Sequence, residues 1–471
     1  MTEIHYWTAR EQAAAIRNRE ISSEELVQAH LARIDQIDPT INAIVTVQPE
    51  QALELARKAD ARTMSGDPLG PLHGLPIAHK DTLDTAGIRT TYGSPIFADH
   101  IPSRNQLVVE RTHAAGAIPI GKTNVPELGL GSHTVNPLFG ATRNPYDRTR
   151  SAGGSSGGAA AALAAGLIPI ADGSDTGGSL RNPASFNNVV GIRPSVGRVP
   201  TWPNKAAWGQ LSVQGPLARN VGDLQMLLSV MAGSDPRSPI SFDDDNPRFE
   251  FEQSVRGLRI AWAPDLGGLP VDPDVTASLA ATVGALPGMG CHIEQACPDL
   301  TGADEIFTTM RAWQLELSYG ALLDAHRGAL GRDIVWNIEQ GRTLTGRDIG
   351  RAEILRTELF HRMRAFFDDY DLLLAPVSQV PPFPIEWPYP STIDGEAMHT
   401  YLDWMKSAYL ISATGCPAMS IPGGFTTTGL PVGLQIIGPH RGEARLLQLA
   451  QAIETATGFG QRRPDLRTHP K

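Results

Sequence analysis

The sequence has few cysteines and no long apolar segment. Its cysteines are Cys291, Cys297 and Cys416, too few and too unevenly spaced for a disulfide framework, and no C-x-x-C pair indicates a zinc site. No run reaches the length of about 18 apolar residues that a membrane span needs. The opening M-T-E-I-H-Y-W has neither the basic nor the apolar region of a secretion signal. We therefore expect a cytoplasmic protein that has no membrane span and binds no metal.

The chain also has no cluster of basic side chains. Its formal net charge is −10, from 40 Lys and Arg against 50 Asp and Glu. Nucleic acids and anionic membranes attract basic patches, so we expect neither as a partner. With 41% hydrophobic and 19% charged residues, the 471-residue chain can bury a large core. Small neutral substrates fit this composition better.

Short apolar runs alternate with helical patterns along most of the chain. A capping box over residues 22–25 opens a helix that Pro39 stops. A turn-rich, acidic stretch at 233–247 is expected to be a surface connection. Strands separated by helices predict an α/β fold whose sheet is mostly parallel in its early part. The predicted strands cover residues 75–78, 117–120, 167–171, 258–262, 372–375 and 418–421.

A glycine-serine run, S-A-G-G-S-S-G-G, occupies residues 151–158 and precedes an alanine-rich stretch that must be helical. A flexible linker is one interpretation, but linkers separate structured parts, and this run directly adjoins a strong helix former. A phosphate-binding loop and a nucleophile turn are the others. Each of these two interpretations requires further motifs elsewhere in the sequence.

The phosphate interpretation has a stronger match elsewhere. G-A-I-P-I-G-K-T (116–123) fits the pattern G-x-x-x-x-G-K-[ST]. In a true phosphate loop the residues between the glycines form a turn whose N–H groups surround the phosphates. Here they are apolar and include a proline, which has no N–H to donate. We therefore predict a strand that ends in a turn, not an ATP site.

The nucleophile interpretation starts from G-G-S-S-G (153–157), which fits G-x-S-x-G and would make Ser155 a nucleophile served by an acid and a histidine. No histidine stands out for that role. A second glycine-serine turn, G-S-D-T-G-G-S-L-R-N-P (173–183), contains Ser179 and suggests that both hydroxyls face one site. The histidine candidates are His292, His326, His361, His399 and His440.

These segments together resemble the amidase signature family, and the similarity spans residues 8 to 460. The resemblance implies one domain over residues 1–471, built on a large mixed central β-sheet covered on both faces by α-helices. Its parts would be an N-terminal helical portion (about 1–65), a signature core (about 66–232) and a second half carrying substrate-pocket elements (about 250–465). The matching segments are G-L-P-I-A-H-K-D (74–81), G-K-T-N-V-P-E-L-G (121–129), the block 153–183, T-G-C-P-A-M-S-I-P (414–422) and G-L-P-V-G-L-Q-I-I-G (429–438).

The same resemblance implies hydrolysis of linear, non-peptide amide bonds. Ser179 would be the nucleophile that forms an acyl-enzyme, Lys80 the base, and Ser155 the serine that relays protons between them. A hydroxyl both donates and accepts, so it suits a relay. Family members also have a cis peptide before the relay serine, which here lies between Gly154 and Ser155. Water would complete the cycle, and neither a metal nor an organic cofactor is implied.

Backbone groups and neighbouring charges would support this chemistry. Glycines in T-G-G-S would let the N–H groups of Thr176, Gly177, Gly178 and Ser179 converge on an oxyanion. Lys80 ends an apolar strand, where burial favours the neutral amine that a base must be. Without the two serine turns, an ion pair of Lys80 with Asp81 or Asp84 would be the favoured interpretation. Ser156 is expected near Lys80 or as a support of its turn, and Asp175 and Arg181 are expected to be structural.

The sequence indicates the substrate less closely than it indicates the site residues. Residues 307–409 hold 14 of the 29 Phe, Trp and Tyr residues, which suggests an apolar pocket for small apolar or aryl amides. The proline-broken loop 381–390 is the favoured source of pocket aromatics. A carbamate hydrolase (urethanase) or a urea-type hydrolase with the same three residues is an alternative. So are a protein that binds without turnover and an amidotransferase subunit that hydrolyses glutamine. A homodimer is left open.

Overall fold

The computed structural model describes residues 3–243, 245–252 and 254–466 of the chain. Its centre is an eleven-stranded mixed sheet in the order β1-β3-β2-β8-β10-β9-β16-β17-β13-β11-β12. These strands are β1 (Ile44–Val47), β2 (Pro76–Lys80), β3 (Ile118–Thr123), β8 (Ile170–Asp175), β9 (Val190–Arg193), β10 (Val213–Ala218), β11 (Arg259–Trp262), β12 (His292–Gln295), β13 (Leu372–Pro376), β16 (Ala418–Phe425) and β17 (Pro431–Ile437).

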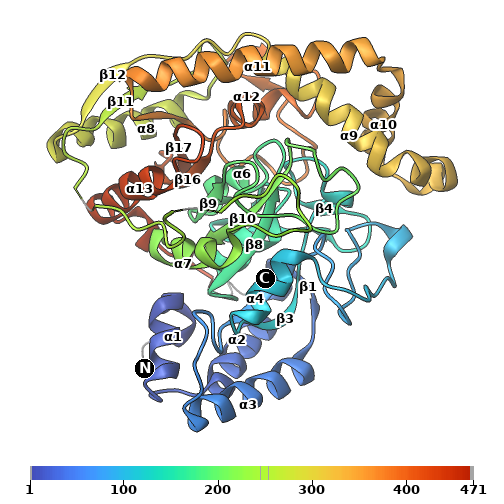
Figure 1. Cartoon of the computed structure of the whole chain (residues 1–471), viewed down its shortest axis with the longest axis vertical. Coiled ribbons are helices and arrows are strands. Elements are labelled where there is room, and N and C mark those ends of the chain that lie inside the picture. The colour runs from blue at the N-terminus through green and yellow to red at the C-terminus, as the bar shows by residue number, and fades with distance from the viewer. Residues whose placement is uncertain (1–2, 244, 253, 467–471) are drawn as a thin grey trace.

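Three two-stranded ribbons and the helices complete the described structure (Figure 1). The ribbons pair β4 (Val135–Asn136) with β5 (Gly140–Ala141), β6 (Arg143–Asn144) with β7 (Asp147–Ser151), and β14 (Thr392–Ile393) with β15 (Glu396–Ala397). The α-helices are α1 (Ala9–Arg17), α2 (Ser23–Ile37), α3 (Pro49–Ser65), α4 (Leu107–Ala114), α5 (Gly157–Ala164), α6 (Arg181–Phe186), α7 (Val221–Met231), α8 (Pro273–Ala285), α9 (Ala303–His326), α10 (Arg332–Thr343), α11 (Gly346–Asp369), α12 (Lys406–Thr414) and α13 (Glu443–Thr457).

Every strand predicted from an apolar run is present, within a few residues of its predicted limits. Strand β2 pairs in parallel with both β3 and β8, which confirms the parallel early part of the sheet. The centre is antiparallel, from β8 through β10, β9, β16 and β17 to β13. The far edge is parallel again, because β11 pairs with both β13 and β12. The sheet is therefore mixed, as the resemblance implies.

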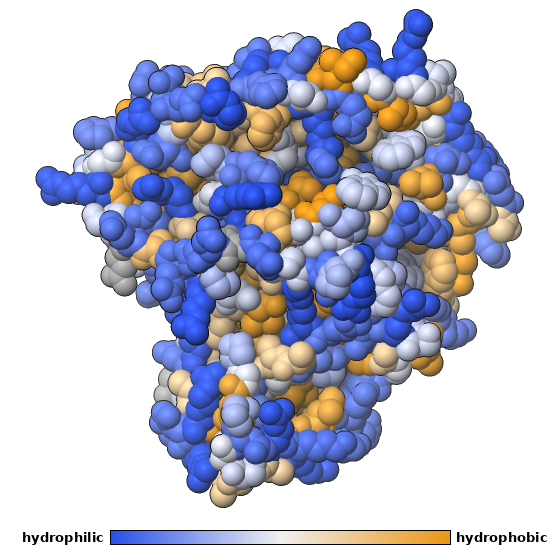
Figure 2. Space-filling view, in the orientation of Figure 1, coloured by the Kyte–Doolittle hydropathy of each residue, from blue (hydrophilic) through white to orange (hydrophobic). Residues whose placement is uncertain are grey.

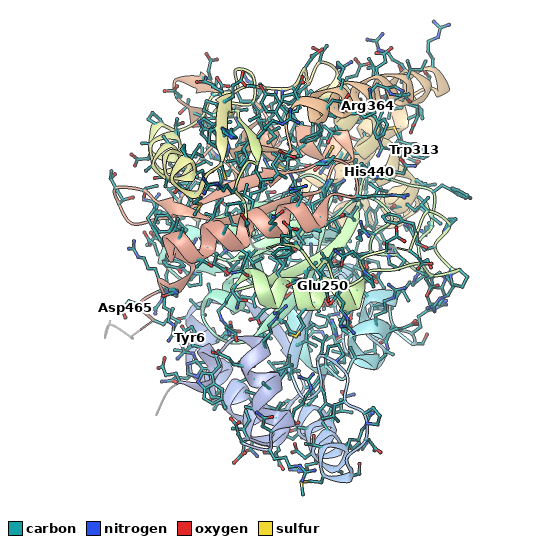
Figure 3. All side chains as sticks on the ribbon, turned by 60° about the vertical axis from the view of Figure 1, so that its left-hand side comes forward. Tyr6, Glu250, Trp313, Arg364, His440 and Asp465 are labelled. Atoms are coloured by element: carbon teal, nitrogen blue, oxygen red, sulfur yellow. The ribbon has the colours of Figure 1, made fainter. Side chains whose placement is uncertain are left out.

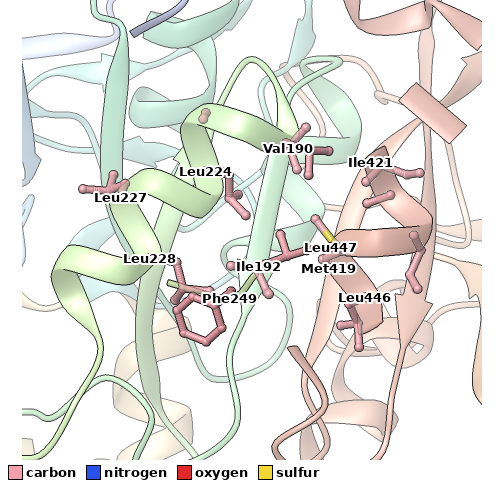
Figure 4. Close-up of a cluster of buried hydrophobic side chains, with 14 of the residues drawn as sticks. Val190, Ile192, Leu224, Leu227, Leu228, Phe249, Met419, Ile421, Leu446 and Leu447 are labelled. Carbon is pink, nitrogen blue, oxygen red and sulfur yellow. The ribbon is translucent and has the colours of Figure 1, made fainter. Parts of the chain in front are cut away.

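Side chains alternate along the strands and bury both faces of the sheet. In β13, Leu372 and Leu374 pack into one cluster, with α1, α4, α7, α8 and α13. Leu373 and Ala375 enter another cluster on the opposite face, with α9, α11 and α12. Farther along that face, α5 covers β8 through Ala171. Figure 4 shows the first cluster, where β9 and β16 meet α7 and α13. The prediction of helices on both faces is confirmed.

The N-terminal portion is not purely helical. Helix α2 begins as predicted, because Ser22 Oγ accepts a hydrogen bond from the Glu25 N–H and the Glu25 carboxylate accepts one from the Ser22 N–H. Strand β1, which the sequence analysis missed, follows it and pairs with β3 at the sheet edge. Figure 3 labels Tyr6 and Asp465 near one another, and the Arg463 guanidinium lies 4.1 Å from the centre of the Tyr6 ring. The two ends of the described chain therefore meet.

Apolar side chains are scattered over the surface, as expected when most of them lie in the interior. On the face drawn in Figure 2, apolar residues form separate patches between hydrophilic ones. None of the helices in the described ranges is both long and apolar enough to cross a membrane. The described residues of 233–247 form turns and bends without helix or strand, as predicted, and residue 244 lies outside the description.

Candidate active site

Lys80 is the last residue of β2 and is completely buried. Its Nζ donates hydrogen bonds to three serine hydroxyls: Ser155 Oγ at 2.8 Å, Ser156 Oγ at 3.0 Å and Ser174 Oγ at 3.0 Å. No described carboxylate forms an ion pair with it. Burial lowers the pKa of Lys80 to about 7, although Asp175 and Asp172 oppose the shift. At neutral pH a large share of this amine is therefore unprotonated and can accept a proton.

Asp172 of β8 holds the strand end that carries Lys80. One carboxylate oxygen accepts the Lys80 backbone N–H at 2.8 Å, and the other has a short hydrogen bond with His79 Nδ1. Burial alone would raise the pKa of Asp172, but His79 and the backbone donor keep it below its usual value. The aspartate thus stays ionised at the base of the site, where it fixes the position of Lys80.

Ser155 lies just before α5, and the peptide bond between Gly154 and Ser155 is cis, as the family resemblance implies. The following helix is entirely buried, so the linker interpretation of this run is wrong. Ser156 adds a backbone link to the second serine turn, because its N–H donates to the Ser179 carbonyl at 3.2 Å. The structure therefore joins the two glycine-serine turns directly.

Ser179 lies in the turn between β8 and α6, which a buried ion cluster supports. Arg181 donates to both carboxylate oxygens of Asp175, each at 3.0 Å, and Arg193 approaches the same carboxylate at 3.3 Å. Burial would raise the pKa of Asp175, but the two guanidinium groups hold it far below its usual range. The structural role expected of Asp175 and Arg181 agrees with these contacts.

The glycines of this turn have steric reasons for their identity. Gly178 has φ +111°, a conformation that other residues rarely adopt. A Cβ on Gly177 would lie 2.6 Å from Phe307 Cζ of α9. The Gly178 N–H already donates to Asp175 Oδ1 at 2.9 Å, so it is committed to the turn itself. This bond narrows the expected oxyanion donors to the N–H groups of Thr176, Gly177 and Ser179.

Ser155, Ser174 and Ser179 line one cavity of about 230 Å³. Much of the remaining wall comes from the loop before β4, from Met405, and from one face of α9 that includes Phe307 and Tyr319. No hydrogen bond joins the Ser155 and Ser179 hydroxyls in the described structure, and Ser179 Oγ has no protein partner there. Catalytic hydrogen bonds are often long without substrate and tighten when it binds.

The structure argues against the other interpretations of these motifs. Lys80 forms no ion pair with Asp81 or Asp84, which instead accept hydrogen bonds from Thr91 and Tyr92. The phosphate-loop pattern at 116–123 lies largely in strand β3, as predicted. None of the five histidine candidates for a Ser-His-acid site lines the cavity.

The prediction of pocket aromatics in loop 381–390 is wrong for this cavity. Phe383 packs in the core, with its ring centre 5.2 Å from that of Trp404, and Trp387 is half exposed at the surface. The aromatic lining comes instead from Phe307 and Tyr319 of α9. The enriched region 307–409 was the right source, but helix α9 rather than the loop faces the serines.

The candidate site also includes Ser174, Asp172 and the α9 face, which the sequence did not point out. Alternation along β8 offered a signal for the first two, since residues 172 and 174 share one face of a strand that leads to Ser179. The α9 face had no local signal, because its approach to the serines depends on how the second half folds over the first.

Comparisons with known proteins agree with this geometry. The model of the Amidase family matches residues 25–447. The chain belongs to the amidase family. It is 36% identical to an acylamidase of Rhodococcus erythropolis over 98% of each chain. It is 37% identical to a subunit of the glutamyl-tRNA(Gln) amidotransferase of Moorella thermoacetica, over 98% of this chain and 99% of that one. The crystal structure of a bacterial aryl acylamidase of the amidase signature enzymes superposes with a TM-score of 0.92 at 30% identity, over 98% of each chain.

Proposed function

We propose that this amidase-family chain hydrolyses small amides through an acyl-enzyme on Ser179. The chain is an amide hydrolase that acts on linear, non-peptide C–N bonds. The observation that supports the mechanism best is Lys80, a buried amine with a pKa of about 7 that is bonded to Ser155 beside the cavity that Ser179 lines. Such an amine can serve as a general base near neutral pH.

In the proposed first half-reaction, Ser179 Oγ attacks the amide carbonyl carbon. Its proton passes to Ser155 Oγ while Ser155 passes its own proton to Lys80 Nζ. The negative oxygen of the tetrahedral intermediate accepts hydrogen bonds from N–H groups of the 176–179 turn. The C–N bond then breaks as Ser155 protonates the leaving nitrogen and recovers a proton from Lys80. A free amine and an ester on Ser179 result.

In the second half-reaction a water molecule attacks the ester carbon. Ser155 and Lys80 take up its proton, and the C–O bond to Ser179 breaks with return of that proton to Ser179 Oγ. The carboxylic acid leaves and the resting state is restored. No cofactor takes part in these steps.

We propose small acyl or aryl amides as substrates. A cavity of about 230 Å³ holds a small molecule rather than a protein chain, and Phe307, Leu315 and Met405 give it apolar surface. The acylamidase and aryl acylamidase relatives support this class. Carbamates present the same carbonyl to Ser179, so carbamate hydrolysis is a second proposal. A cytoplasmic location stays a prediction, and a homodimer stays open.

The competing function is that of an amidotransferase component, because relatives such as that of Moorella thermoacetica have that name. An independent hydrolase should hydrolyse simple amides without any partner protein. A glutaminase component should release ammonia from glutamine and depend on partner proteins.

The test is turnover of an aryl amide, an aliphatic amide, an N-aryl carbamate and glutamine by the purified wild type and by Ser179→Ala. We expect amide hydrolysis to fall by at least about 10³-fold in Ser179→Ala, since removal of a serine nucleophile can cost as much as about 10⁶-fold. Activity that survives the substitution would refute Ser179 as nucleophile. Cleavage of glutamine alone would replace the proposal with the amidotransferase function.

A further inference from the structure

One face of α9 forms a wall of the proposed catalytic cavity. Phe307, Arg311, Leu315 and Tyr319 recur at the four-residue spacing of a helical face, and all four line the cavity with Ser179. Phe307 packs against Gly177, so this face lies directly beside the nucleophile turn. Figure 1 shows α9 in the upper, second half of the molecule. The second half therefore presents Arg311 to the site.

Arg311 is the one charged side chain among the described residues that line this cavity. It is also unusual among the buried arginines of the described structure, which otherwise have carboxylate partners. Arg181 and Arg193 share one aspartate, and Arg198 pairs with a glutamate. Arg311 is 8% exposed and forms no ion pair with a described residue. Burying a charge without a counter-ion costs stability, so a buried unpaired arginine in a cavity indicates a functional role.

Neutral groups hold the Arg311 guanidinium in place. One terminal nitrogen has a short hydrogen bond to Asn337 Oδ1 of α10, and the other has a short hydrogen bond to the Tyr401 hydroxyl. Asn337 Nδ2 also donates to the Tyr401 hydroxyl at 2.8 Å, which closes the network. No described residue accepts a hydrogen bond from Arg311 Nε. The network orients the cation but leaves its charge unneutralised.

We infer that Arg311 binds a carboxylate of the substrate, a specificity that rests on the proposed amide hydrolysis at Ser179. A guanidinium matches a carboxylate with two parallel hydrogen bonds, and such pairs are strong in a buried site. The substrate would then supply the counter-ion that the protein omits. This inference departs from the neutral substrates that the net charge favours, because the charge that matters is the one beside the serines.

Two matched pairs of amides test this inference and locate the carboxylate. For the acyl side, the succinyl and butyryl amides of 4-nitroaniline differ by one carboxylate in place of a methyl group. For the amine side, 4-acetamidobenzoate is compared with acetanilide. We expect kcat/KM of the wild type to favour the carboxylate-bearing member of one pair by at least about tenfold. The pair that shows the preference identifies the side of the scissile bond that Arg311 contacts.

The variant Arg311→Gln should remove that preference. Its kcat/KM for the preferred acid should fall at least about tenfold more than its kcat/KM for the neutral member of the pair. Arg347→Gln is the matched control, because it removes one positive charge at the exposed start of α11. If Arg311→Gln does not fold, Arg311→Lys keeps the charge without the fork and should lose part of the preference.

Two results would overturn the inference. Equal kcat/KM within both pairs for the wild type would refute it without any variant, and so would an equal loss on acid and neutral amides in Arg311→Gln. If hydrolysis depends on Ser179 but shows no preference for the carboxylate-bearing amides, the role of Arg311 is refuted and the proposed function stands. A wild type that hydrolyses no amide would refute the proposed function as well.

Discussion

At the scale of single residues, the proposed chemistry depends on an amine that gives up its proton near neutral pH. Lys80 Nζ is in contact with hydroxyl groups rather than carboxylates, so its charged form has hydrogen-bond acceptors but no counter-ion in contact. The aspartates that raise its pKa act from beyond this shell, and burial outweighs them. The site thus provides a base without a histidine.

This arrangement predicts the pH dependence of the reaction. Because Lys80 must be neutral to accept a proton and burial lowers its pKa to about 7, kcat/KM should rise as pH rises through 7 and level off above it. One pH unit below that pKa, kcat/KM should be about tenfold below the plateau. A pH profile of kcat/KM on a neutral aryl amide measures this, from about pH 5 to about pH 9, which is about two units to either side of the pKa. A rate that is flat or that falls across this range would exclude Lys80 as the base.

A second residue-scale prediction concerns Asp175. Asp175→Asn removes the one carboxylate that Arg181 and Arg193 share, and it leaves two buried cations without a counter-ion. We expect the free energy of unfolding to fall by about 3–5 kcal/mol, measured by denaturant titration. Asp299→Asn is the control, because the Asp299 carboxylate, which pairs with Arg362, is 60% exposed. Its loss should lower the free energy of unfolding by less than about 1 kcal/mol. Equal losses in both variants would contradict the structural role of Asp175.

At the scale of elements, the glycine run has two functions. Its first half forms the cis turn, and its second half brings α5 against the backbone of the first strands. A Cβ on Gly158 would lie 2.3 Å from Asn124 N and 2.6 Å from Ala43 O. Both contacts are to backbone, which cannot move aside as the end of a side chain can. Helix α5, which follows Ser155, can approach the ends of β1 and β3 only because Gly158 has no side chain.

Gly158→Ala should therefore destabilise the protein, by about 1–3 kcal/mol or more as in overpacked cores. Gly284→Ala is the matched control, since Gly284 lies in α8 with open space around its Cβ position. Alanine favours helix, so this control should stabilise by about 0.5–1 kcal/mol. Thermal unfolding of both variants measures the contrast. Similar shifts of the same sign would show that the close approach of α5 is not needed.

Elements also show how far the sequence predicts this protein. Strand β13 was predicted because it is a continuous apolar run, and β8 because an apolar run leads into it. Lys80, Ser155 and Ser179 were predicted because they stand in long, specific motifs. Strand β1 was missed because it is a short edge strand within a helical region. Arg311 was missed because what distinguishes it is the lack of an ion pair with any described residue, and only the tertiary structure shows which carboxylates are near.

At the scale of the whole molecule, one sheet passes through both halves of the chain. Strand β9 of the first half pairs with β16 of the second, at Ala418 with Arg193 and Ser420 with Gly191. Beneath this junction one apolar cluster extends from Ala9 of α1 to Ile453 of α13. The halves also share the site, since the first supplies the serines and the second supplies α9.

This continuity predicts that the chain unfolds as a single cooperative unit, consistent with the single domain expected from the sequence. Separating the halves would expose the apolar cluster and break the ladder between β9 and β16, so neither half should persist alone. Differential scanning calorimetry should give one transition whose calorimetric and van't Hoff enthalpies agree, if unfolding is reversible. The loss of hydrolytic activity should follow the same curve, because the serines and α9 would separate only on global unfolding. Two resolved transitions, or activity lost well before the main transition, would show instead that the second half opens independently and that the catalytic cavity is the weakest interface of the fold.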